Sequence, residues 1–193
     1  MANNEDFSVM RKELENFDMQ REAVIKKSRD ILKNAKQSIY CVHRKDMKNA
    51  KSLLDSAKKD ILSLKDSVSK LYEIESIGAF SDAMQEYVEA LCFYDYAVTE
   101  KLTSKKKTGA NTEDYLMGIC DFTGELGRMA VMAATKKDLK AVEGIKNTVD
   151  EIYGELMQFN FRNGELRKKY DSVKWNLRKI EDILYDLSIR GIK

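Results

Sequence analysis

Apolar residues recur along most of the chain at steps of three and four, the period of an amphipathic α-helix. One such stripe lies between about Asp6 and Cys41, and a second runs from Met47 to Leu71. The members of the first stripe are Phe7, Met10, Leu14, Phe17, Val24, Ile25, Ser28, Ile31, Leu32, Ala35 and Ile39. The join between the two helices is predicted near His43–Asp46, where Asp46 is placed to cap the second helix.

A third helix is predicted to begin near Gly78, with Ser76 or Ser81 as candidate caps, and to end near Leu102. The stretch Ser104–Asn111 follows. It has no apolar period, so it is predicted to be a loop. Neighbouring helices with a short connection usually run antiparallel, and we expect this of the helices on either side of the loop.

The C-terminal part of the chain carries three more helical stripes. Thr112 is predicted to cap a helix from Glu113 to about Ala134, whose acidic first turn suits the helix dipole. The next helix is predicted from about Lys137 to Asn160. Asn163–Gly164 mark a break, and a last helix is predicted to end at Ile189.

The composition suits a chain made mostly of long helices. None of the 193 residues is proline, which breaks helix interiors, and 34% are charged, as in helices with salt-bridged outer faces. No internal repeat and no long linker divides the sequence. We therefore predict an all-α fold, a single-domain antiparallel bundle of six to seven helices over residues 1–193.

Charge and cysteine content narrow the classes of function. The formal net charge of +2 is too balanced to indicate nucleic-acid binding, which would need local clustering or oligomer geometry. The three cysteines lack metal-ligand spacing and are expected to be buried, reduced thiols. No phosphate-binding loop and no Ser/His/Asp arrangement occurs. Without a signal core or an apolar run of about 18 residues, a cytoplasmic protein with no membrane partner is expected.

Two pairs of acidic residues have helical spacing. Glu86 and Glu89 are three apart, and Asp121 and Glu125 are four apart, so each pair presents both carboxylates on one face. In an antiparallel pair of helices, Glu89 and Glu125 would each lie roughly 21 Å from the loop, at one level. Four clustered carboxylates repel one another unless a cation neutralises them, and Mg²⁺ or Mn²⁺ is the cation that such oxygens favour.

The helical pattern alone favours another interpretation of these acidic residues. On a helical wheel, Glu86 and Glu89 point about 120–180° away from the apolar arc around Phe80 and Leu91. Asp121 and Glu125 also lie off the apolar arc of their helix. Solvated acidic faces are common on helices, so spacing by itself does not establish a metal site.

Three blocks of sequence resemble the translin/TRAX family. They are Glu113–Arg128 (EDYLMGICDFTGELGR), Leu166–Lys174 (LRKKYDSVK) and Lys179–Gly191 (KIEDILYDLSIRG). The blocks are long and specific, and the order of helices fits the family along nearly the whole chain. The resemblance implies an all-α protomer that assembles into a closed, hollow octamer and handles single-stranded nucleic acid on its inner surface.

The resemblance also bears on catalysis. In this family translin mainly binds, whereas TRAX also cuts RNA with carboxylates that hold Mg²⁺, a Glu-x-x-Glu pair and an Asp-x-x-x-Glu pair. This sequence matches both pairs, as Glu86/Glu89 and Asp121/Glu125. Its C-terminal run is closer to translin, yet Ser76–Ser81 lacks the basic, His-containing stretch of translin. The mixture resembles an ancestral-type, single-gene member that forms a homo-oligomer and is its own catalytic subunit.

RNA must be held by cationic side chains. The candidates are Arg21, Arg29, His43, Arg44, Lys45, Lys48 and Lys51, with Lys105–Lys107 as a further contribution from the loop. Arg44, Lys48 and Lys51 have helical spacing and are predicted to share a face. The alternative for each is a solvated basic side chain. Trp175 is predicted to be a core or subunit-interface anchor rather than a platform for stacking bases.

Together these features predict a Mg²⁺-dependent endoribonuclease that binds and cleaves single-stranded RNA inside a hollow homo-octamer. Glu86, Glu89, Asp121 and Glu125 would hold the metal and carry the catalysis, with Mn²⁺ as a substitute ion. Glu125 is the candidate general base. Two alternatives stay open. One is a non-catalytic oligomer that binds single-stranded RNA or DNA, like translin, and the other is a purely structural helical assembly.

Overall fold

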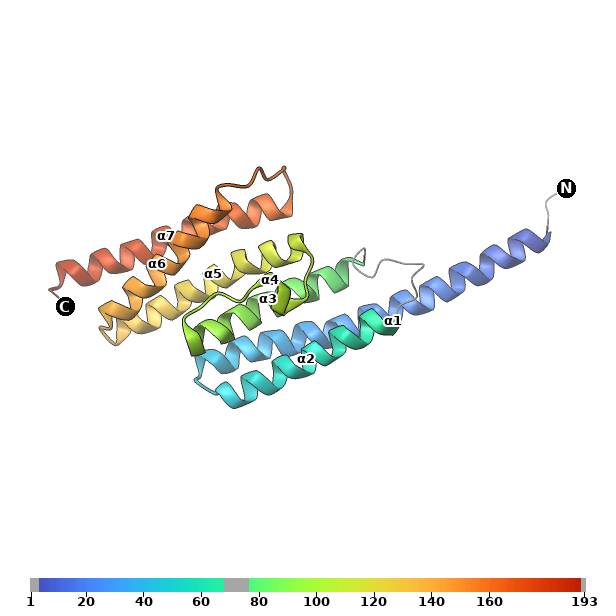
Figure 1. Ribbon diagram of the computed structural model, residues 1–193, viewed down its shortest axis with the longest axis horizontal. Coiled ribbons are helices and arrows are strands. Elements are labelled where there is room, and N and C mark those ends of the chain that lie inside the picture. Colours follow the sequence, from blue (N-terminus) through green and yellow to red (C-terminus); the bar gives the residue numbers. More distant parts are fainter. Residues whose placement is uncertain (1–3, 68–76, 192–193) are drawn as a thin grey trace.

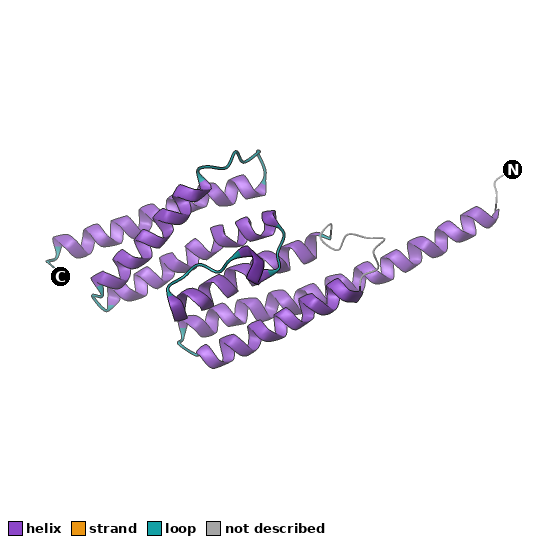
Figure 2. Cartoon of the chain, in the orientation of Figure 1, coloured by secondary structure: helices purple, strands orange, loops and turns teal. Residues whose placement is uncertain are grey.

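The computed structural model describes residues 4–67 and 77–191, and within these ranges every regular element is a helix (Figures 1 and 2). The helices are α1 (Asn4–His43), α2 (Met47–Ser67), α3 (Gly78–Thr99), α4 (Lys105–Thr108), α5 (Thr112–Thr135), α6 (Leu139–Leu156) and α7 (Glu165–Ile189). The predicted all-α class and number of helices are confirmed.

The long helices form two groups of three, α1–α2–α3 and α5–α6–α7, and in each group the middle helix runs opposite to the other two (Figure 1). The groups pack together through α3 and α5. These two helices run in the same direction, because Ser81 bonds to Asp114 at one end of the pair and Tyr96 packs on Phe122 further along. The antiparallel orientation predicted for this pair is therefore wrong.

The segment Glu100–Asn111 explains the parallel orientation. It runs back along the bundle, so that α5 starts beside the beginning of α3 (Figure 1). Asp95 anchors the segment by accepting hydrogen bonds from Thr103 (2.5 Å) and Lys107 (2.6 Å). The hydroxyl of Tyr115 donates to the carbonyl of Thr103 (2.5 Å). One helical turn, α4, lies within the stretch that is predicted to be a plain loop.

Side-chain caps account for several helix starts. Asp46 caps α2 as predicted, by accepting a hydrogen bond from the backbone N–H of Asn49 (3.3 Å). The cap of α5 is Asn111 rather than Thr112, because the Asn111 side chain accepts from the N–H of Asp114 (2.8 Å). The one-residue difference leaves Thr112 as the first residue of the helix.

Other boundaries differ more from the prediction. Helix α3 begins at Gly78 without a side-chain cap, since Ser81 bonds to another helix and Ser76 lies outside the described residues. Helix α6 is shorter than predicted at both ends. Its cap is Asp138, whose side chain accepts from the N–H of Ala141 (3.1 Å). Helix α7 follows the predicted break and ends where predicted.

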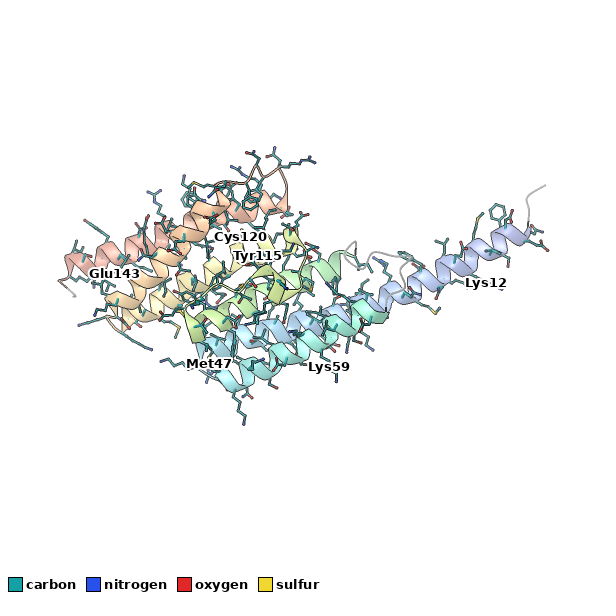
Figure 3. All side chains as sticks on the ribbon, in the orientation of Figure 1. Lys12, Met47, Lys59, Tyr115, Cys120 and Glu143 are labelled. Carbon is teal, nitrogen blue, oxygen red and sulfur yellow. The ribbon has the colours of Figure 1, made fainter. Side chains whose placement is uncertain are left out.

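The N-terminal arm, residues 4–21 of α1, projects beyond the rest of the bundle (Figure 1). Figure 3 shows Lys12 on this arm with no other described helix beside it. Phe7, Met10 and Leu14 belong to the predicted apolar stripe, yet they are 54%, 52% and 64% exposed. The stripe becomes buried from Val24 onward, where α2 and α3 pack against α1.

The core lies around α3, which packs against both α1 and α5. Cys92 and Cys120 are fully buried in it, as expected of small apolar thiols, and Cys41 is half-buried. Trp175 is 65% exposed, so the core alternative for this residue is wrong. None of the helices formed by residues 4–67 and 77–191 combines the length and the apolarity that crossing a membrane requires.

Candidate functional site

The four predicted carboxylates lie where α3 and α5 pack closely. A Cβ atom on Gly118 of α5 would stand 2.7 Å from the carbonyl oxygen of Gln85 and 2.7 Å from the Cβ of Val88 on α3. Glycine therefore permits this approach, since no larger residue fits without a shift of backbone. With α3 and α5 parallel, the next turns place Glu86 and Glu89 within electrostatic reach of Asp121 and Glu125, and Lys169 bridges Gln85 on α3 and Asp121 on α5. We call the four acidic residues the carboxylate cluster.

Burial and like charge act together on the carboxylate cluster. Burial and the negative charges of the other three members raise the pKa of Glu89 to about 9. Burial also raises the pKa of Glu86 above its ordinary value, against the opposing charge of Lys36. Glu89 forms no hydrogen bond or ion pair with the described residues, so nothing there directly compensates its ionised form.

The burial of Glu89 differs from what the helical wheel predicts, which is a solvent-exposed acidic face. Glu89 is only 9% exposed and Glu86 is half-buried, although both lie away from the apolar arc of α3. The reason is that α3 is covered by α1 on one side and by α5 on the other, so its polar face is also enclosed. The solvated-face interpretation is wrong for Glu89.

Two lysines from outside the α3–α5 pair approach the carboxylate cluster. Lys36 of α1 lies 3.7 Å from Glu86. Lys169 of α7 forms an ion pair with Asp121 and donates a hydrogen bond to the side-chain oxygen of Gln85 (3.0 Å). The cluster therefore receives positive charge from the first and the last helix of the fold.

Glu125 is the best-held member of the carboxylate cluster. His43 of α1 is hydrogen-bonded to it through Nε2, and a terminal nitrogen of Arg128 donates to its two oxygens at 2.9 and 2.8 Å. Burial raises the pKa of Glu125, but these two partners together outweigh it and leave the pKa below its ordinary value. The His43 ring also packs on Phe93, with centroids 4.7 Å apart. Its side chain is 9% exposed.

These pairings bear on metal binding. Within residues 4–67 and 77–191, no three His, Cys, Asp or Glu side chains stand in an arrangement ready to hold a metal ion. Lys169, His43 and Arg128 already occupy oxygens of Asp121 and Glu125. The donor chemistry nevertheless fits a hard divalent cation, because the cluster offers only carboxylate oxygens and Glu89 has no cationic partner. A cation would have to replace part of the present pairing.

The predicted RNA-binding residues do not all come together. Arg21 and Arg29 lie on exposed positions of α1, and even Arg29 is roughly 21 Å along the helix from His43. Lys48 and Lys51 share an exposed face at the start of α2, and Lys51 pairs with Asp55. These residues remain candidates for nucleic-acid contact.

Two neighbours in the turn before α2 behave differently from the prediction. Arg44 lies in this turn rather than on the helix, so the predicted shared face is wrong for it. Its guanidinium lies 5.4 Å from the centre of the Tyr40 ring and bonds to the Tyr40 hydroxyl (3.1 Å). Lys45 is exposed and has a positive φ of 61°, an uncommon backbone state at a tight turn. His43 turns toward Glu125.

Sequence reasoning missed Lys169, Gln85, Lys36 and Arg128. A signal for Lys169 exists in the helical period, because it stands three residues after Leu166 and four before Val173, within the apolar stripe of α7. A lysine inside such a stripe needs an anionic partner. Arg128 stands three residues after Glu125, a spacing that favours an ion pair on one helix. No comparable signal marks Lys36.

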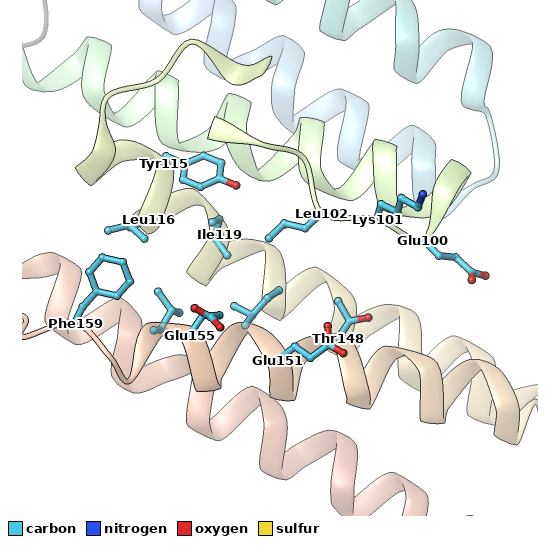
Figure 4. Close-up of a pocket in the computed structure, with 12 residues that line it drawn as sticks. Glu100, Lys101, Leu102, Tyr115, Leu116, Ile119, Thr148, Glu151, Glu155 and Phe159 are labelled. Carbon is cyan, nitrogen blue, oxygen red and sulfur yellow. The ribbon is translucent and has the colours of Figure 1, made fainter. Parts of the chain in front are cut away.

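A pocket of about 530 Å³ lies apart from the carboxylate cluster (Figure 4). It is formed by α5, α6 and the start of the segment Glu100–Asn111, with Leu116, Ile119 and Phe159 among its apolar lining residues and Glu151 and Glu155 among its charged ones. No member of the cluster lines it. This pocket is therefore not part of the candidate reaction site.

Comparison with known proteins places the chain in a family. The model of the Translin family matches residues 19–191. The chain is 40% identical to translin of Gallus gallus over 80 residues, which cover 42% of this chain and 35% of that protein. It is 26% identical to translin-associated protein X of Mus musculus over 226 aligned positions, covering 96% of this chain and 78% of that protein. The chain thus spans about a third of the chicken translin that it matches.

Solved structures agree with this relationship. The crystal structure of AfC3PO superposes with a TM-score of 0.88 at 25% identity, covering 97% of this chain and 100% of that one. A second structure of AfC3PO, described as a complex with duplex RNA, superposes with a TM-score of 0.87 at 24% identity, covering 96% and 97%. The chain therefore has the fold of these proteins over its whole described length.

Proposed function

The chain belongs to the Translin family, and from that membership and the carboxylate cluster we propose that it is a Mg²⁺-dependent endoribonuclease acting on single-stranded RNA. The observation that carries the proposal is the placement of Glu86, Glu89, Asp121 and Glu125 at the close contact of α3 and α5, where Glu89 is only 9% exposed. Burial and the charges of the other three carboxylates raise the pKa of Glu89 to about 9. A purely structural site gains nothing from such repulsion. Enzymes use clusters of this kind to bind and position hard cations.

In this proposal each residue of the cluster has a task. Glu86, Glu89 and Asp121 hold Mg²⁺, for which Mn²⁺ substitutes. The ion, when bound, supplies a Lewis acid that neutralises phosphate charge and activates water. His43 and Arg128 keep Glu125 ionised and oriented, the form in which a carboxylate accepts a proton from water.

Relatives support RNA as the substrate class. AfC3PO, which shares the fold, is described in complex with duplex RNA. Exposed Lys48 and Lys51, with Arg21 and Arg29 further along α1, are the proposed contacts for the phosphate backbone. Single-stranded RNA stays the proposed substrate, and single-stranded DNA a further one.

Self-association completes the proposal. We infer a homo-oligomer, with an octamer as the expected size, because the protomer exposes apolar side chains that a partner would cover. Phe7, Met10 and Leu14 lie on the N-terminal arm, and Trp175 and Tyr185 on α7 are 65% and 67% exposed. The cytoplasmic location also remains a prediction from sequence.

A cleavage assay tests the catalytic claim. Labelled single-stranded RNA is incubated with Mg²⁺ and either the wild-type protein or the Glu89→Gln variant, which keeps the shape of the side chain without its charge. We expect the variant to lose at least about a hundredfold in rate, the scale of losing about 2.7 kcal/mol of transition-state stabilisation. Glu143→Gln, at an exposed position of α6, is the matched control and should cleave normally. Equal cleavage by all three proteins removes the cluster from the mechanism.

A second function has its own support. The present pairing of Asp121 and Glu125 with Lys169, His43 and Arg128 suits a stable protein that binds single strands without cutting them. Salt-sensitive binding of single-stranded RNA or DNA, with no metal-dependent turnover in the same assay, would establish this alternative.

A further inference from the structure

Lys169 makes contacts within the carboxylate cluster that resemble those of a bound cation. Its Nζ forms an ion pair with Asp121 and donates to the side-chain oxygen of Gln85 at 3.0 Å. Its charge also favours the ionised forms of Glu86 and Glu89 and so opposes the rise of their pKa. Carboxylate and amide oxygens are the same donors that a hard divalent cation takes in proteins. A single ammonium group therefore pairs directly with Asp121 and acts through space on Glu86 and Glu89.

The side chain of Gln85 is held in place by other hydrogen bonds, so its contact with Lys169 does not depend on Lys169 alone. Gln85 is 9% exposed, and its amide nitrogen donates to Ser81 (3.0 Å) and to Asp114 (3.2 Å). Asp114 is held in turn by the side chain of Asn111 (2.9 Å). With its nitrogen engaged in this way, the amide directs its oxygen toward Lys169.

Lys169 and a divalent cation would compete for the same oxygens. Two positive charges on one oxygen of Asp121 repel each other strongly in a half-buried site. The lysine side chain is 29% exposed and sits on a flexible four-carbon stem, so its ammonium has a path toward solvent. The competing group is carried by α7, whereas Glu86 and Glu89 belong to α3 in the other helical group.

We propose that Lys169 is an internal cation that occupies the carboxylate cluster of the metal-free protein and leaves it when a divalent cation binds. The inference deepens the proposed function, because it concerns the same cluster and assigns Lys169 control over metal loading. Lys169 is a positioning residue for the carboxylates. When a divalent cation replaces it, the contact between Lys169 of α7 and Gln85 of α3 is lost, so metal binding changes how α7 meets α3.

Binding of Mn²⁺ to the full chain tests the exchange without any measurement of cleavage. Wild-type protein stripped with a chelator is titrated with Mn²⁺ by calorimetry, in parallel with Lys169→Met. Removal of the competing charge is expected to tighten Mn²⁺ binding by about tenfold, the effect of about 1.4 kcal/mol. In the same metal-free samples Lys169→Met should have a lower Tm than wild type, and Mn²⁺ should raise its Tm by a larger increment.

Lys168→Met is the matched control. Lys168 stands next in the chain, is exposed, and pairs with Glu165 (2.6 Å) on its own helix. It should bind Mn²⁺ like wild type and show the wild-type Tm increment. If Lys169→Met is poorly folded, Lys169→Arg replaces it. That variant keeps the competing charge and should bind Mn²⁺ no more tightly than wild type.

The outcomes separate this inference from the proposed function. Equal or weaker Mn²⁺ affinity of Lys169→Met, compared with wild type, overturns the exchange even if the protein cleaves RNA. Absence of Mn²⁺ binding by both proteins overturns it as well. Tighter binding by Lys169→Met, with no RNA cleavage by wild type, supports the exchange and refutes the nuclease.

Discussion

Gly118 lies so close to the backbone of Gln85 that a Cβ atom on it would stand 2.7 Å from the Gln85 carbonyl oxygen. Because the obstacle is backbone, Gly118→Ala has to push α3 and α5 apart. We expect this variant to lose about 1–3 kcal/mol of unfolding free energy, measured by urea denaturation. It should also weaken divalent-cation binding, since the same two helices carry the carboxylates.

Gly127→Ala is a matched control on the same helix. A Cβ atom at Gly127 meets nothing within 4 Å, so alanine should stabilise the helix by about 0.5–1 kcal/mol through its better helix propensity. The two substitutions are chemically identical and should have opposite signs. Loss of stability in both would mean that the α3–α5 contact is not the reason for Gly118.

Glu89 should make stability depend on pH in the metal-free protein. Its pKa rises from an ordinary 4.5 to about 9 in the folded state. The folded state therefore binds more protons than the unfolded state between these values. This contribution to stability is fully present below the unfolded pKa and is lost as pH rises through the folded pKa. Urea denaturation in a chelator should show Glu89→Gln gaining roughly 1–3 kcal/mol over wild type at pH 8.

The difference between Glu89→Gln and wild type should shrink as pH falls toward 5, because the carboxyl of the unfolded wild-type chain then also becomes protonated and no proton uptake accompanies folding. Glu143→Gln, at an exposed position, provides the baseline and should show no such convergence. A constant gap between Glu89→Gln and wild type from pH 5 to 8 would contradict a buried, proton-binding Glu89.

Lys48 and Lys51 should contribute electrostatically to RNA binding. Both are exposed on one face of α2. If each neutralises one phosphate, the double variant Lys48→Ala/Lys51→Ala should reduce the slope of log K against log salt by about 1.4 for a single strand. Fluorescence anisotropy with a labelled oligonucleotide at several salt concentrations measures the slope. Lys140→Ala, at the start of α6, is the control, and an unchanged slope in the double variant excludes this face.

Trp175 should report self-association. It is the one tryptophan in the sequence and is 65% exposed in the protomer. If subunits cover it, its fluorescence should shift to shorter wavelength as protein concentration rises, because the indole leaves water. Light scattering on the same samples should show the mass increasing in step, and Trp175→Ala should lower the mass at a given concentration. A monomer mass with solvent-exposed emission at all concentrations contradicts the oligomer.

Local chemistry made much of the fold predictable. The cap at Asp46 and the break before Glu165 depend on side chains and backbone within a few residues, and both are found as predicted. The apolar period of α7 depends on one helix only. Such features need no knowledge of what lies across the bundle.

Features that depend on two distant segments were harder to predict. The α3–α5 pair runs parallel because Asp95 and Tyr115 hold a returning segment, and no single-helix pattern contains that information. The carboxylate cluster forms nonetheless, because the parallel arrangement of α3 and α5 also brings the two acidic pairs to one level along the helices. The burial of Glu89 and the contact of Lys169 with Asp121 follow from helices on both sides of α3, which a helical wheel omits.

Because α1 is one continuous helix, a partner bound to its N-terminal arm lies far from the carboxylate cluster. Leu14 on the arm and His43 beside Glu125 belong to one continuous rod, about 44 Å apart at the helical rise. Physiological salt screens charge over about 8 Å, so a partner seated around Leu14 exerts no direct electrostatic pull on Glu125. Such a partner can affect the cluster only by tilting or rotating α1 as a rigid helix. That movement would shift Lys36 and His43 together, because they are seven residues apart and lie on one face of α1.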